Sequence, residues 1–320
     1  MTEPEPETEP ASPPAPSVEP DVADSPPKPE ESVGRPLGPI ALACVCYLLF
    51  CTLLPLIPLP LRTTPRHILA IGALLSTLVY MALLLWVPWT ISGARPRTRV
   101  AVLLGLGMLA LYPGLTFVAP WLFAFRPGHP PPTLVLMLWN PVTGLWMAAG
   151  FCLVGVALSH VVREAKLLLP LGLVLGLIDI VGAMTPVGFT ANAVASHPEV
   201  VRALSVPVPT VGHLQPLTYV GPGDALFMGF FLSVVHRFRM NKGATFRLMY
   251  VLLALSLVIV LFTGISIAAL FPMGLSVILA NLRFFRFSRE ETFAMIYAGA
   301  ITLLAAVGFF FYTNHHVFHH

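Results

Sequence analysis

The feature that most constrains the fold is a series of long apolar runs, which begins at Gly38 and continues almost to the C-terminus. Short polar loops separate these runs. The chain is 56% hydrophobic and only 10% charged, whereas soluble domains are usually about 25% charged. Apolar runs of about 20 residues are typical of helices that cross a bilayer. We therefore predict an all-α fold, a polytopic membrane helix bundle.

Hydropathy predicts about nine membrane-spanning helices. The fourth contains Asn140-Pro141, which indicates a kink or a partly interfacial position. The eighth is short and follows a loop. The expected spans are 38–60, 67–92, 100–125, 133–161, 167–188, 216–236, 246–264, 267–283 and 292–313.

Charge divides the chain into segments. Nine of the fifteen acidic residues lie in the first 31 positions, within a Pro-rich stretch that is nearly free of large apolar side chains. Such a segment cannot bury enough surface to offset its ordering entropy, so residues 1–36 should be disordered. The remaining segments are four helices in 37–165, four helices in 166–285, and a last helix with a His-rich tail in 286–320.

The loops carry an asymmetric distribution of Lys and Arg. Twelve lie in loops on the same side as the N-terminus and four lie in the opposite loops. Cytoplasmic loops carry the excess of positive charge, so we expect a cytoplasmic N-terminus. The twelve are Arg95, Arg97, Arg99, Arg163, Lys166, Arg237, Arg239, Lys242, Arg247, Arg283, Arg286 and Arg289, and the four are Arg62, Arg66, Arg126 and Arg202.

Two acidic residues, Asp179 and Asp224, fall inside predicted spans. A carboxylate at the bilayer centre costs about 2.5–3.5 kcal/mol on insertion scales, and no intramembrane Lys or Arg is placed to neutralise either one. Their predicted depths match, since each lies roughly 12–14 Å from the same membrane face. We therefore expect two antiparallel helices to bring the carboxyl groups together as an active site.

Two carboxyls in a low-dielectric site do not both ionise easily, so they share one proton. Such a pair supplies a base to activate water and an acid to protonate a leaving amine, as in aspartic proteases. The same residues also suit a proton-coupled transporter, and the acidic residues alone do not separate the two. A third interpretation is an inactive relative that binds membrane helices.

The motifs around these residues resemble those of the presenilin and signal peptide peptidase family of intramembrane aspartyl proteases. The family's Gly-x-Gly-Asp motif is matched by Gly221, Gly223 and Asp224. The presenilin pattern Asp-x6-Pro-x-Gly is matched by Asp179, Pro186 and Gly188. An altered form of the family's Pro-Ala-Leu element follows in residues 268–274. The resemblance covers residues 167–285 and implies a presenilin-like catalytic half.

The chain also departs from the family pattern. Ile178 stands where a Tyr usually precedes the first aspartate, and Ala268 stands where a Pro opens the third element. Four spans rather than five precede the first catalytic helix, and a further span follows the last one. These differences affect the expected docking of substrate more than the pair of carboxyls.

The resemblance implies hydrolysis of peptide bonds within transmembrane helices, with Asp179 and Asp224 as catalytic residues. Gly221 and Gly223 would let a substrate backbone approach, and Leu270, Phe271 and Pro272 would hold an extended substrate by strand addition. We expect no metal and no organic cofactor. The partners would be helical membrane substrates and lipid. A net charge of +3 without a basic stripe indicates no nucleic acid. The membrane would be the bacterial inner membrane or an organelle membrane.

Overall fold

A computed structural model describes most of the chain from residue 37 onward. The acidic tail, most of the loop 189–215 and the His-rich C-terminus lie outside the described residues, so the predictions made for them stay predictions. The described residues are 37–57, 65–118, 133–184, 196, 204–210, 219–263, 268–285, 288–293 and part of 296–308.

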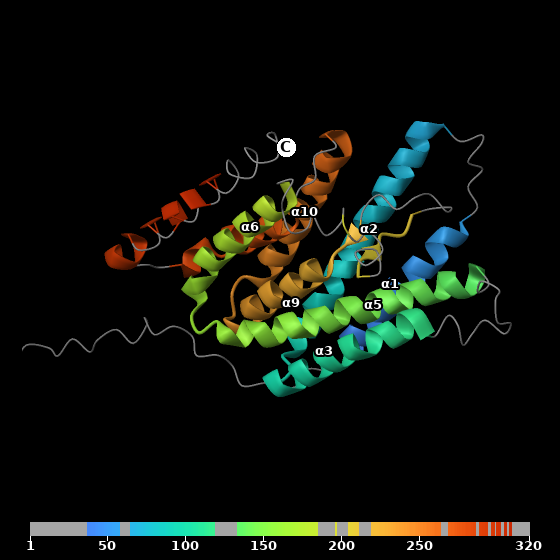
Figure 1. Cartoon of the computed structure of the whole chain (residues 1–320), viewed down its shortest axis with the longest axis horizontal. Coiled ribbons are helices and arrows are strands. Elements are labelled where there is room, and N and C mark those ends of the chain that lie inside the picture. Colours follow the sequence, from blue (N-terminus) through green and yellow to red (C-terminus); the bar gives the residue numbers. More distant parts are fainter. Residues whose placement is uncertain are drawn as a thin grey trace, which may run out of the picture.

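Helices dominate the described part of the chain (Figure 1). The α-helices are α1 (Gly38–Leu53), α2 (Arg66–Ala94), α3 (Thr98–Pro113), α5 (Thr133–Leu158), α6 (Leu168–Met184), α9 (Pro222–Arg237), α10 (Lys242–Thr263) and α11 (Leu270–Ala280). Short turns of helix are η2 (Leu54–Leu56), η3 (Gly114–Val118), η4 (Ser159–Val161), η5 (Ala165–Leu167) and η7 (Leu282–Phe284). The described residues of 289–308 are also helical.

Five of these helices are long and apolar enough to cross a membrane. They confirm an all-helical, membrane-embedded bundle. The predicted span 267–283 is wrong in length, because α11 has 11 residues and rises only ~16 Å against a hydrocarbon core of ~30 Å. The five helical stretches are Gly38–Leu56, His67–Ala94, Thr98–Thr116, Leu138–Val161 and Lys242–Val260.

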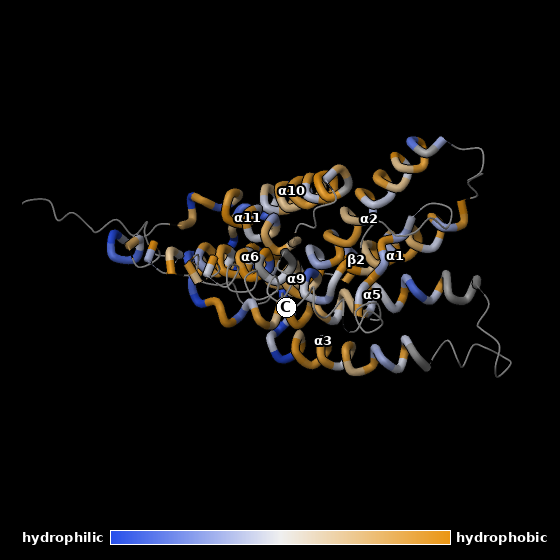
Figure 2. Tube along the Cα trace, turned by 45° about the horizontal axis from the view of Figure 1, so that its top comes forward, coloured by the Kyte–Doolittle hydropathy of each residue, from blue (hydrophilic) through white to orange (hydrophobic). Residues whose placement is uncertain are grey.

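The outer faces of the helices expose large apolar side chains. Leu103 on α3 is 73% exposed and Phe262 on α10 is 81% exposed. Figure 2 shows hydrophobic residues along the helices, with hydrophilic residues gathered mainly near helix ends. In a soluble protein such surfaces would drive association. In a bilayer they face lipid, which is as apolar as they are.

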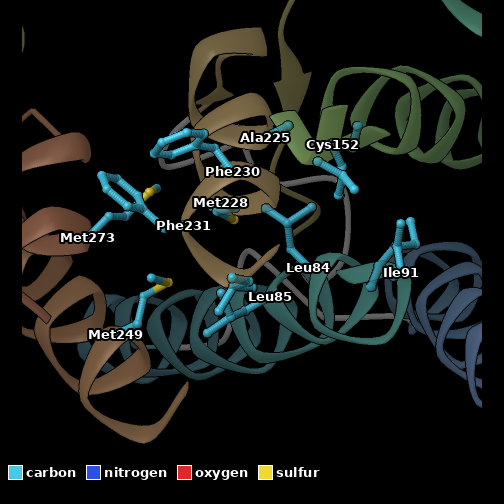
Figure 3. Close-up of a cluster of buried hydrophobic side chains, with 14 of the residues drawn as sticks. Leu84, Leu85, Ile91, Cys152, Ala225, Met228, Phe230, Phe231, Met249 and Met273 are labelled. Atoms are coloured by element: carbon cyan, nitrogen blue, oxygen red, sulfur yellow. The ribbon is translucent and has the colours of Figure 1, made fainter. Parts of the chain in front are cut away.

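Helix α9 lies at the centre of the bundle, between α5 and α2. Its buried residue Phe231 packs in the same cluster as Leu84 and Leu85 of α2, as Figure 3 shows. Met273 of α11 and Met249 of α10 close the opposite side of that cluster. The helix that carries Asp224 is therefore held by four neighbours.

Glycines set the closest helix crossing, between α5 and α9. A Cβ on Gly155 would overlap the backbone oxygen of Leu226, and a Cβ on Gly229 would lie 2.8 Å from the Cα of Cys152. Each glycine thus faces the backbone of the other helix. Small residues at such crossings are the usual means of close packing in membranes.

Helix α11 connects α6, which carries Asp179, with α9, which carries Asp224. It packs against α6 and α10 and also contacts α9. Its contact with α6 is again made by glycine, since a Cβ on Gly274 would lie 3.0 Å from the backbone oxygen of Gly172. The two helices that carry the aspartates were expected to bring the carboxyl groups together directly, but the principal partner of α6 is α11 rather than α9.

A short antiparallel ribbon precedes α9. Strand β1 (Val206–Pro207) pairs with β2 (Tyr219–Val220), with Val206 opposite Val220. The predicted span 216–236 therefore starts too early. Hydropathy alone does not separate an apolar strand from the start of an apolar helix, and the chain becomes helical only at Pro222.

Candidate active site

Asp224 lies in the first turn of α9. Gly221 is the N-cap, with extended backbone at φ −78° and ψ 160°, and Pro222 follows at the first helical position, where its missing N–H costs nothing. The Gly221 N–H donates a hydrogen bond of 3.1 Å to Asp224 Oδ2. The carboxylate therefore makes the half of a capping box in which the third helical residue bonds back to the N-cap N–H, and the prediction that it lies eight residues inside a span is wrong.

Asp179 lies on α6, one turn before the end of the described helix. Its Oδ2 accepts a hydrogen bond of 2.8 Å from the backbone N–H of Leu270, the first residue of α11. That N–H is one of the four at a helix start with no partner inside the helix. Asp179 therefore ties α6 to the positive end of the α11 dipole.

Both carboxylates are half-buried, and the start of α11 lies next to each of them. Leu270 donates to Asp179, while the preceding residue, Ala269, lines a cavity beside Asp224. The structure thus places the two predicted catalytic residues in one region, although by a route different from the direct pairing of two long helices.

The cavity beside Asp224 measures about 150 Å³, which is room for several water molecules. It lies between α2, α9, α10 and α11, next to the ribbon, and most of its wall is apolar. The polar side chains at its edge, apart from Asp224, come from Thr77, Tyr80, Tyr219 and Ser256. The site therefore combines a half-buried carboxylate, space for water and an apolar surround.

The polar residues of α2 that line this cavity were not predicted from the sequence. Tyr80 is 1% exposed and shares a hydrogen bond of 3.1 Å between its hydroxyl and that of Tyr47 on α1. Thr77 donates to the carbonyl of Ala73 at 2.8 Å. A signal was available, because Thr77 and Tyr80 are three residues apart on one face of an otherwise apolar helix.

The predicted substrate-binding residues divide into two groups. Gly223 is exposed, and a Cβ there would meet nothing within 4 Å, so its surface is open beside Asp224. Leu270, Phe271 and Pro272 instead form the first turn of α11. The prediction that they offer an extended edge for strand addition is wrong, because the segment is helical and the Leu270 N–H already binds Asp179.

The described residues contain no group of three or more His, Cys, Asp or Glu side chains that could hold a metal ion. The four histidines of the C-terminal tail lie outside the described residues, as do Pro186 and Gly188 of the presenilin-like pattern.

Comparisons with protein-family models, with curated proteins and with solved structures gave no match. The resemblance to the presenilin and signal peptide peptidase family thus stands on the motif residues alone. Within the described residues these are Asp179, Gly221, Gly223 and Asp224. The function is accordingly argued from the chemistry of this site.

Proposed function

We propose that this protein is an intramembrane aspartyl protease that hydrolyses peptide bonds within transmembrane helices. The observation that carries the proposal is that two half-buried carboxylates lie beside the start of α11, where Asp179 accepts from the Leu270 N–H and Asp224 shares a cavity wall with Ala269. Two carboxyls in such surroundings hold one proton between them. An ionised carboxylate and a protonated carboxyl are the two groups that hydrolysis of an amide needs.

In the proposed reaction the ionised carboxylate takes a proton from a water molecule, and the water oxygen bonds to the scissile carbonyl carbon. The protonated carboxyl gives its proton to the amide nitrogen as the carbon–nitrogen bond breaks. The products are a carboxylic acid and an amine, and the pair ends with one proton, as it began. The cavity beside Asp224 has room for that water.

A substrate helix has to unwind locally before its carbonyl is accessible. The extended segment Tyr219–Val220 leads directly into Gly221 and already pairs as a strand with Val206–Pro207. We propose that unwound substrate lies along this ribbon by strand addition, with its backbone passing over the open surface of Gly223. The apolar ring of Phe271, 43% exposed at the start of α11, would contact substrate side chains.

The finer topology belongs to the same proposal. The N-terminus would be cytoplasmic, in a bacterial inner membrane or an organelle membrane, and nine apolar segments would enter the bilayer, with the eighth too short to cross it alone. The presenilin-like catalytic half would be 166–285. The tail 1–36, the helices of 37–165 and the segment 286–320 would lie outside that half. A single thiol introduced at position 200, in a variant without the native cysteines, should react from outside intact cells. Reaction only after permeabilisation would reverse the orientation.

The test of the activity is peptide cleavage by the purified chain in detergent, where no ion gradient exists. Wild type should cut a helical membrane substrate and be blocked by a mimic of the hydrated peptide bond. Asp179→Asn and Asp224→Asn should each reduce the cleavage rate by at least ~10²-fold. Glu290→Gln, which removes one carboxylate elsewhere, is the matched control and should cut like wild type. Absence of cutting by wild type would contradict the proposal.

The same variants separate catalysis from helix capping. Asparagine keeps the side-chain oxygen that accepts the Gly221 or Leu270 N–H, so both Asn variants should fold like wild type. Gly223→Ala places a methyl group in open space and should also fold normally, but it should slow cleavage because substrate passes there. Folded Asn variants with full cleavage would leave the carboxylates only a capping role.

A further inference from the structure

A groove on the outer surface between α2 and α10 is separate from the candidate active site. It has a volume of about 510 Å³ and is open to the surroundings. Its wall is apolar except for one charged residue, Arg247. On α2 it is lined by Ala82, Leu83, Trp86 and Trp89, and on α10 by Gly243, Phe246 and Arg247.

Contacts at both ends hold the groove open. At one end the ring of Trp89 packs against Phe246 at 5.1 Å and against the buried His236 at 4.5 Å between ring centroids. At the other end the hydroxyl of Tyr250 donates a hydrogen bond of 3.4 Å to the carbonyl of Leu78. Ala82 lines the groove with a small side chain. The groove is therefore preformed, and binding there orders few new side chains.

The dimensions and the charge of the groove suit one lipid molecule. The α2 wall runs from Ala82 to Trp89, seven residues or ~10 Å along the helix, which is about two thirds of one ~15 Å leaflet. Arg247 lies near the start of α10, close in sequence to Lys242, at the end where α2 reaches Arg95. The polar end of the groove is thus the positively charged end of both helices.

Among the described residues that line the groove, none is acidic. Arg247 is exposed, and its Nε donates at 3.2 Å to the carbonyl of Gly243. In the part of the chain that the structure describes, the ion pairs join Lys166 to Glu164 and Glu291, and none reaches Arg247. A guanidinium at a membrane interface binds phosphate oxygens with paired hydrogen bonds. Trp side chains beside it are typical of the same interface.

We propose that this groove binds one anionic phospholipid, with an acyl chain over Trp86 and Phe246 and the phosphate on Arg247. The anionic class follows from charge complementarity, since a zwitterionic head group brings its own cation to the phosphate. Bound lipid would link α2 and α10, both of which line the cavity beside Asp224. The inference does not depend on the proposed protease activity.

The test uses the full chain in detergent, titrated with phosphatidylglycerol or with phosphatidylcholine of the same acyl chains. Native mass spectrometry should show one tightly bound phosphatidylglycerol and weaker phosphatidylcholine. Arg247→Gln should weaken phosphatidylglycerol binding about tenfold. The matched control is Arg283→Gln, which removes one positive charge outside the groove and should bind like wild type. Equal binding of the two lipids, or equal loss in the two variants, would overturn the proposal.

A second measurement does not need the Arg247 variant to fold. Phosphatidylglycerol with brominated acyl chains should quench tryptophan fluorescence in the wild-type chain. Trp86→Phe keeps an aromatic wall but removes a fluorophore from the groove, so the quenched fraction should fall. Quenching that is unchanged in Trp86→Phe would show that the acyl chain lies elsewhere, and the site would then be wrong.

Discussion

The substitution Gly155→Ala tests the close crossing of α5 and α9. Its Cβ would overlap the backbone oxygen of Leu226 and lie 2.8 Å from the backbone nitrogen of Phe230. These are the acceptor and donor positions of one i→i+4 hydrogen bond of α9. The methyl group would therefore enter a helical hydrogen bond two residues beyond Asp224, where no flexible side chain can move aside.

The size of the effect follows from these distances. Restoring an ordinary contact of ~3.5 Å to the Phe230 nitrogen requires α5 and α9 to separate by ~0.7 Å, and the Leu226 oxygen requires more. Overpacking of this kind costs ~1–3 kcal/mol, and rigid backbone on the far side places Gly155→Ala at the upper end. The gain from replacing a helical glycine, ~0.5–1 kcal/mol, offsets part of it. We expect a net loss of ~2 kcal/mol.

A matched control is Gly107→Ala on α3, where a Cβ would meet nothing within 4 Å. It should leave stability unchanged or raise it by ~0.5–1 kcal/mol. Gly229→Ala should behave like Gly155→Ala, since its Cβ would lie 2.8 Å from the Cα of Cys152. The double variant should cost less than the sum, because one separation of the helices relieves both overlaps.

The assay is reversible unfolding of the purified chain in mixed micelles, followed by helical circular dichroism. Gly155→Ala should unfold at a clearly lower denaturant fraction than Gly107→Ala. If Gly155→Ala is as stable as Gly107→Ala, the tight backbone crossing of α5 and α9 is refuted. It is also refuted if the stability losses of Gly155→Ala and Gly229→Ala simply add in the double variant.

Three further outcomes are expected. Asn281, fully buried, accepts from the Asn241 N–H at 2.8 Å and donates to Thr245 at 2.8 Å, so Asn281→Ala should lower the unfolding free energy by ~1–3 kcal/mol. The Lys166 ammonium lowers the pKa of Glu291, and the Glu291 carboxylate raises the pKa of Lys166. The stability that Glu291 contributes is therefore fully present above the ordinary carboxyl pKa, and it is lost as pH falls through the lowered pKa of the folded state. Acid should therefore reduce the melting temperature less in Glu291→Gln than in wild type. Deleting residues 2–34 should leave the melting temperature unchanged.

Apolar run lengths were enough to predict most helices. Both ends of α2 and α5, and the starts of α1 and α6, lie within three residues of the predicted spans, because these runs are bordered by charged or Pro-containing loops. Helix α1 ends at Leu53, seven residues before the predicted end. Helix α10 starts at Lys242, one turn before the prediction. The side chain of Asn241 accepts from the Ala244 N–H at 3.2 Å, and asparagine before a helix is a start signal that hydropathy ignores.

The start of α9 could also have been predicted. Gly221, Pro222 and Asp224 occupy the N-cap, first and third positions of the helix, which are positions that these residue types favour. The site motif was interpreted only as chemistry and not as a helix start. The start of the last helix could also have been predicted, because Ser288 and Glu291 form a capping box. The Ser288 N–H donates to the Glu291 carboxylate at 3.0 Å, and the Glu291 N–H donates to the Ser288 hydroxyl at 3.2 Å.

The link between Asp179 and Leu270 could not be predicted, because 91 positions separate them and a backbone N–H leaves no trace in residue type. That link changes the argument about buried carboxylates. From the sequence, no intramembrane Lys or Arg was placed to neutralise the negative charges of Asp179 and Asp224, which suggested that nothing offset the cost of burying them. Each instead accepts a hydrogen bond from the backbone at a helix start, where the dipole favours negative charge.

Because backbone N–H groups rather than a cation stabilise the two carboxylates, their protons can still move. A Lys or Arg partner would hold a carboxylate ionised through a full opposite charge, whereas one N–H occupies a single oxygen and leaves the other free to accept or carry a proton. Asp179 and Asp224 each use Oδ2 for the helix start, and the hydrogen bonds among the described residues leave Oδ1 of each for a water or a substrate. The arrangement anchors both side chains and still permits proton transfer, and that combination is what a hydrolytic pair requires.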